Sequence, residues 1–141
     1  MDNCCFKFQG QLFTFSGGDA VPIPIEIQLA CSDETTALTS GTSKITFRSP
    51  VAFTLTGVRA SLATAQASGS IFTADINQNG TSVLSTKLTI DNTEKTSVTA
   101  STASVISTSA IADDAEITID IDQIGNGTAK GLKITLIGTR W

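Results

Sequence analysis

The densest group of potentially reactive side chains is a run of carboxylates near the C-terminus. Glu116, Asp120 and Asp122 alternate with isoleucines, which places them on one face of a strand. Carboxylates two residues apart could hold a hard cation or act as an acid–base pair. A solvated outer strand face explains them equally well, and it is the interpretation we favour. The Gly125–Gly127 turn would then bring opposite charges close to them, from Lys130, Lys133 or Arg140.

A second group is the segment Asp75-Ile76-Asn77-Gln78-Asn79-Gly80, which matches the first half of an EF-hand calcium loop. Such a loop needs a bidentate Glu at its twelfth position, where this chain has Thr86. Asn-Gly between two strand-like runs is a strong hairpin signal, because both residues tolerate positive φ. We therefore predict a turn at Asp75–Gly80 and no metal.

The nucleophile inventory is poor. The chain has no His, which removes the usual general base and the commonest metal ligand. The three cysteines are Cys4, Cys5 and Cys31, with neither CxxC spacing nor a fourth zinc ligand. An odd number of thiols cannot pair completely within one chain, although bonds between subunits stay open. We expect no catalytic residues, no cofactor and no enzymatic activity.

Charge and hydropathy limit the partners. Thirteen acidic and 9 basic residues among 141 give a net charge of −4, which argues against nucleic-acid binding. The chain contains no run of 18 apolar residues, so we expect no membrane span. The N-terminus lacks the charged and apolar regions of a secretory signal, so we expect synthesis in a cytosol.

Alternation of apolar and polar residues dominates the chain. It predicts strands at 6–8, 12–15, 23–29, 44–48, 51–63, 70–77, 81–90, 104–106, 115–122 and 132–137. Pro22 and Pro24 cannot donate to a ladder, so the strand from Ile23 begins at a sheet edge or in an extended arm. The phase changes at Gly57-Val58, which predicts a bulge or bend.

These strands predict an all-β fold, an antiparallel jelly-roll-like β-sandwich of about eight strands with an N-terminal arm. We assign residues 1–20 to the arm and residues 21–141 to the sandwich domain. The arm carries Phe6, Phe8, Phe13 and Phe15, which the sandwich does not need for closure. We predict that these rings form an interface with a partner. Trp141 either caps the core or joins a subunit or ligand interface, where Trp is enriched.

The segments 53–91 and 113–141 resemble a small β domain of structural proteins of tailed bacteriophages. The resemblance is found in the sequence motifs GVRASL, ADINQNG, AEITIDIDQIG and GLKITLIGTR. The similarity covers about residues 45–141 and leaves the N-terminal fifth outside. It implies a β-sandwich, a virion setting and trimeric assembly, and it supplies no functional residues to carry over.

Two classes of function follow. The first is a capsid cement (decoration) protein, made in the host cytoplasm, that binds the major capsid protein as a homotrimer in the virion. The alternative is a head or tail fibre component, or a receptor-binding module that recognises host surface carbohydrate. Sugar sites usually present stacked aromatic rings, and a chain with one Trp and no Tyr offers few of them.

Overall fold

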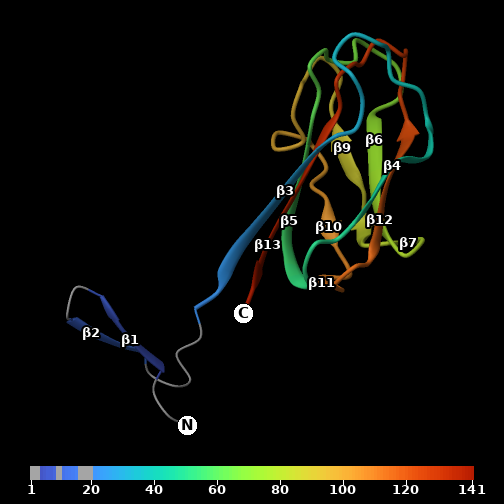
Figure 1. Ribbon diagram of the computed structural model, residues 1–141. Coiled ribbons are helices and arrows are strands. Elements are labelled where there is room, and N and C mark those ends of the chain that lie inside the picture. The colour runs from blue at the N-terminus through green and yellow to red at the C-terminus, as the bar shows by residue number, and fades with distance from the viewer. Residues whose placement is uncertain (1–3, 9–10, 16–20) are drawn as a thin grey trace.

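The computed structural model describes residues 4–8, 11–15 and 21–141, with side chains from residue 21 onward. Every element of this part of the chain is a β-strand, and every named pairing is antiparallel (Figure 1). The predicted all-β class is therefore confirmed.

The first sheet has four strands, in the order β11-β5-β13-β3. They span β3 Ile23–Ala30, β5 Phe53–Ser61, β11 Ala110–Ile111 and β13 Lys133–Arg140. The last of these strands in the sequence, β13, lies between β5 and β3. The alternation that predicted it buries Ile134 and Leu136 and leaves the intervening residues half-buried.

The second sheet follows the order β4-β12-β6-β7, and β9 also pairs with β6. Its strands span β4 Gly41–Arg48, β6 Phe72–Gln78, β7 Thr81–Ser82, β9 Leu88–Ile90 and β12 Glu116–Gln123. A small separate ladder joins β8 Leu84–Thr86 to β10 Val105–Ile106. The single strand predicted over 81–90 is thus wrong: it is three short strands. Adjacent Val83 and Leu84 are both buried, which breaks the period of two there.

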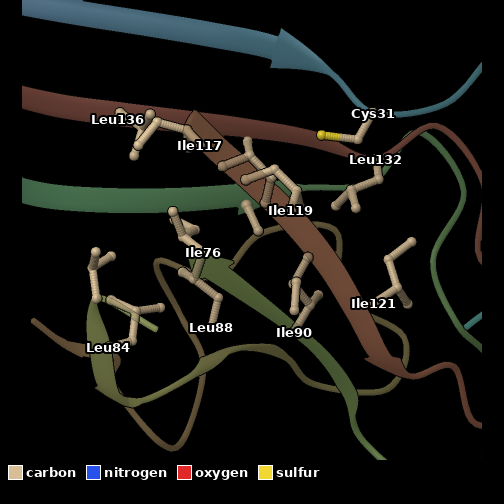
Figure 2. Close-up of a cluster of buried hydrophobic side chains, with 14 of the residues drawn as sticks. Cys31, Ile76, Leu84, Leu88, Ile90, Ile117, Ile119, Ile121, Leu132 and Leu136 are labelled. Atoms are coloured by element: carbon tan, nitrogen blue, oxygen red, sulfur yellow. The ribbon is translucent and has the colours of Figure 1, made fainter. Parts of the chain in front are cut away.

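The core lies between the two main sheets, and Figure 2 shows Ile76, Ile117, Ile119 and Ile121 from the second sheet in one cluster with Leu132 and Leu136. Ile76, Ile119 and Leu132 are completely buried. Burial of this apolar surface is the main stabilising contribution to such a domain. The sandwich architecture is as predicted, and the jelly-roll order of its connections stays a prediction.

The start of β3 is an edge, as its prolines indicated. Cys31 donates its N–H to the Leu132 carbonyl at 2.8 Å, and the β3–β13 register runs without a shift from there to Ile23. Because N–H groups alternate sides along an antiparallel strand, those of the even-numbered residues of β3 face away from β13. Pro22 and Pro24 belong to that even set. Each proline therefore stands where a donor would otherwise face the free edge.

Two predicted irregularities are confirmed. Asn79 has φ 50° and Gly80 φ 84°, the backbone of a type I′ hairpin between β6 and β7. The β5–β13 register shifts between Ile137, opposite Gly57, and Gly138, opposite Leu55. The extra residue on β5 is the bulge expected beside Gly57.

Within the arm, β1 Cys4–Phe8 and β2 Gln11–Phe15 form an antiparallel hairpin. Phe6 stands opposite Phe13, and Cys4 opposite Phe15. Since residues two apart share a strand face, this register places Phe6, Phe8, Phe13 and Phe15 on one face of the hairpin. The division at residue 20 into arm and sandwich stays a prediction.

Candidate functional site

The carboxylates of β12 do lie on the outer side of their strand, because Ile117, Ile119 and Ile121 are buried. Their expected charge partners are wrong, however. The Gly125–Gly127 turn does not close a hairpin: β12 belongs to the second sheet and β13, with Lys133 and Arg140, to the first. Neighbouring elements supply the cations instead. Arg48 Nη2 lies 3.7 Å from Glu116 Oε2, and Lys87 Nζ lies 2.6 Å from Asp122 Oδ2.

Asp75 is the most buried carboxylate near this face, with 4% of the residue exposed. Its Oδ1 accepts hydrogen bonds from Ser82 Oγ at 2.6 Å and Ile76 N at 2.8 Å. Its Oδ2 lies 3.3 Å from Lys87 Nζ, so one ammonium bridges Asp75 and Asp122. Sequence analysis missed Lys87. Its one signal was a cation at a polar position inside a strand-like run.

Asp120 is held in the same way. Its Oδ1 accepts the Ser43 N–H at 2.7 Å, and its Oδ2 accepts from Asn77 Nδ2 at 3.0 Å. Carboxylates whose oxygens are occupied by protein donors make a structural network. Among the residues with described side chains, no three Cys, Asp or Glu side chains form a group that could hold a metal ion.

We therefore expect a chelator to leave the thermal stability of the protein unchanged. Asp75 and Asn77, which looked like calcium ligands, are taken up by Ile76, Ser82, Lys87 and Asp120. Thermal melts with and without EDTA should overlay. A fall of several degrees with EDTA, restored by calcium, would show that bound metal stabilises the fold and that our interpretation is wrong.

Cys31 is buried against the core and is not in a disulfide (Figure 2). Burial raises the pKa of its thiol to about 11, only partly offset by a hydrogen bond from the Ile134 backbone. The thiolate is the reactive form of cysteine. The fold therefore lowers the reactivity of Cys31 in two ways, because burial blocks access of reagents and the raised pKa keeps the thiol protonated.

We expect Cys31 to resist alkylation in the native protein near pH 8 and to react when the chain is unfolded. Peptide mass spectrometry after iodoacetamide treatment distinguishes labelling of Cys31 from labelling of the adjacent pair Cys4 and Cys5. A Cys31 that labels at the same rate with and without urea would contradict its burial.

A groove lies at the end of the sandwich where β3 begins and β13 ends. It has a volume of about 690 Å³, with Val51, Phe53, Ile111, Asp113, Arg140 and Trp141 in its lining. The register pairs Arg140 with Ile23, so the start of β3 lies at this same end. We call Val21, Ile23, Trp141 and this groove the Trp141 end.

The Trp141 end exposes three large hydrophobic side chains to solvent. Trp141 is 74% exposed, Val21 76% and Ile23 46%. Trp141 therefore does not cap the core, which was one of its two expected roles. Its role in an interface stays a prediction. The side-chain contacts of Phe6, Phe8, Phe13 and Phe15 lie outside the described residues.

A second, smaller groove of about 350 Å³ crosses the outer face of the first sheet. Glu26 from β3, Arg59 from β5 and Thr135 from β13 contribute to its lining. Its character is more polar, and Val98 is the one strongly exposed hydrophobic residue beside it.

In the part of the chain with described structure, we find no helix long and apolar enough to cross a bilayer. Comparisons with protein-family models, with curated proteins and with solved structures find no match for this chain.

Proposed function

We propose that this chain is a non-enzymatic structural protein of a bacteriophage virion, a cement (decoration) protein that binds the capsid surface as a homotrimer. The virion setting comes from the resemblance of residues 45–141 to phage structural domains. The proposal needs no cofactor, and its partners are further copies of the chain and the major capsid protein.

The observation that carries an assembly role is the Trp141 end. Val21, Ile23 and Trp141 are three of the six large hydrophobic residues exposed in residues 21–141, and all three are at this end of the sandwich. Soluble proteins rarely leave such residues clustered unless the surface contacts a partner. Away from this end, the carboxylates of Asp75, Asp120 and Asp122 are engaged by protein donors, which leaves the Trp141 end as the surface that favours a binding role.

Copy number tests the proposal directly. A cement protein covers the capsid, so in purified particles its band should be within a few-fold of the major capsid protein on a molar basis. A handful of copies per particle would contradict the cement role and favour the fibre or receptor-binding alternative.

Deletion of residues 1–18 should leave a folded β domain whose attachment to particles or assembly is weakened. The fold should persist because the strands of the two main sheets pair with one another within residues 21–141. Cosedimentation with particles lacking the protein measures binding, and far-UV circular dichroism checks the fold. Undiminished cosedimentation of the deletion variant would remove the arm from the particle contact.

One observation favours the carbohydrate-binding alternative. The groove sets the exposed Trp141 ring in one lining with Asp113 and Arg140, a pairing of stacking surface and polar groups that suits a sugar. Glycan binding that quenches Trp141 fluorescence and is lost in Trp141→Ala would support it.

A further inference from the structure

We infer that the Trp141 end of one copy is the docking surface for the N-terminal hairpin, β1–β2, of a second copy. This inference rests on the homo-oligomer of the proposed function and names the two surfaces that would form its contact.

The accepting surface is described in atomic detail. Trp141 and Arg140 border a groove whose apolar lining includes Val51, Phe53 and Ile111. Val21 and Ile23 expose further apolar surface at the same end of the sandwich, since Ile23 is paired with Arg140. A cleft with an exposed indole at its rim suits a partner that presents aromatic rings.

The donating surface follows from the hairpin register. Phe6 opposite Phe13, with Phe8 and Phe15 two residues further along, gives one face with four Phe positions. Lys7, Leu12 and Thr14 fall on the other face. An isolated two-stranded hairpin is marginally stable at best, so its apolar face needs a surface to pack against.

The direction of the chain favours a second copy over the hairpin's own. Pro22 and Pro24 fix φ near −65°, and each restricts the residue before it to extended conformations. The stem Val21–Pro24 therefore leads the chain straight out of β3 beyond the Trp141 end. This direction carries the chain away from the groove of its own copy.

Strand addition to β3 is not the mode of contact at this end. The even-numbered N–H groups face the free edge of β3, and Pro22 and Pro24 lack them. The hairpin must therefore bind through its side-chain face. Because donor and acceptor surfaces differ, each copy gives one and receives one, and such head-to-tail contacts can close into a ring.

The test uses the intrinsic fluorescence of the full-length protein. Trp141 is the only Trp and the chain has no Tyr, so its emission reports on this end alone. As the protein is diluted from an assembled to a monomeric concentration, followed by light scattering, we expect emission to move to longer wavelength. Acrylamide quenching should rise in parallel.

Phe6→Ser and Phe13→Ser in the full chain should each raise the concentration of half-assembly by at least about tenfold, the worth of one buried aromatic ring. Val98→Ser is the matched control, because Val98 is 64% exposed but belongs to the other groove. It should change neither mass nor emission.

Three results would overturn the inference. These are an oligomer whose Trp141 stays as quenchable as in the monomer, a short-wavelength emission independent of concentration, or an assembly midpoint that both Phe variants leave unchanged. Short-wavelength emission at every concentration would mean that the hairpin docks on the Trp141 end of its own copy. Failure of the proposed function is distinguishable, since it would be seen in copy number and particle binding while this self-assembly persisted.

Discussion

Replacing Gly125 with Ala should lower the free energy of unfolding by about 3 kcal/mol or more, through loss of buried hydrogen bonds and left-handed strain. Gly125 has φ +55°, a conformation that L side chains rarely adopt. A Cβ there would meet Ser70 O at 2.5 Å and would overlap the Gln66 amide more closely still.

Gln66 cannot yield easily, because it is completely buried. Its Nε2 donates to Ser70 O and, at 2.6 Å, to Asn92 Oδ1. Among the described side chains, Gln66 Oε1 is the one buried polar atom without a hydrogen-bond partner. A methyl group on Gly125 would displace the amide from both acceptors and leave the buried Nε2 of Gln66 without its hydrogen bonds.

Gly80→Ala is the matched control. Gly80 also has positive φ, +84°, but a Cβ there would meet nothing within 4 Å. Its substitution should cost only the backbone strain, about 1 kcal/mol. The midpoints of urea unfolding, compared at an unchanged m-value, measure the loss of unfolding free energy in both variants. Equal losses in the two variants would mean that the Gln66 network adjusts freely to the added methyl group.

Replacing Lys87 with Met should cost about 2 kcal/mol, because it leaves the Asp75 carboxylate buried without its cation. The Asp75 side chain is 5% exposed, while that of Lys87 is 43% exposed, so water screens part of the interaction. The loss is therefore smaller than for a completely buried pair. Lys133→Met is the control, since its partner Glu34 is 54% exposed and the pair should contribute less than about 1 kcal/mol.

A double-mutant cycle isolates the interaction. In Asp75→Asn the buried charge is gone, so Lys87→Met should cost much less in that background. Equal costs of Lys87→Met with and without the Asp75 charge would show that the pair does not stabilise the fold.

The same interaction has a pH signature. The hydrogen bond to Asp122 raises the pKa of the Lys87 ammonium above its ordinary 10.5, against an opposing effect of partial burial, and the Asp75 charge adds to the rise. Because the folded-state pKa is the higher one, this stabilisation is complete below pH 10.5 and is lost as pH rises above it. The stability difference between the natural chain and Lys87→Met should shrink in that range.

Local signals predicted much of this fold. Alternating isoleucines fixed β3 and β12 within a residue or two, because the period of two is a property of a few neighbouring residues. Asn79-Gly80 gave the β6–β7 turn for the same reason, since its left-handed backbone depends on those two residues. Pro22 and Pro24 placed β3 at an edge.

The wrong charge partners of β12 and the contacts that sequence analysis missed are matters of long-range pairing. A glycine-rich turn between two alternating segments looks like a hairpin, yet the chain after Gly127 crosses to the other sheet. The local sequence cannot distinguish a hairpin from a crossing to the other sheet, since the result depends on which distant strands compete to pair with β12. The same holds for Lys87 and Asp75, and for the juxtaposition of Ile23 with Arg140 at the Trp141 end.

The central position of β13 also sets the order in which the protein can fold. Translation delivers β3 and β5 early, but until Lys133–Arg140 has emerged from the ribosome β3 has no neighbour in the first sheet and β5 has only the two-residue β11. Pairings this distant in sequence make folding slow, and the waiting strands keep apolar residues such as Ile27 and Leu55 exposed meanwhile. Chains that stop before β13 should therefore be substrates for chaperones and proteases, and the sandwich should close in one late, cooperative step after synthesis.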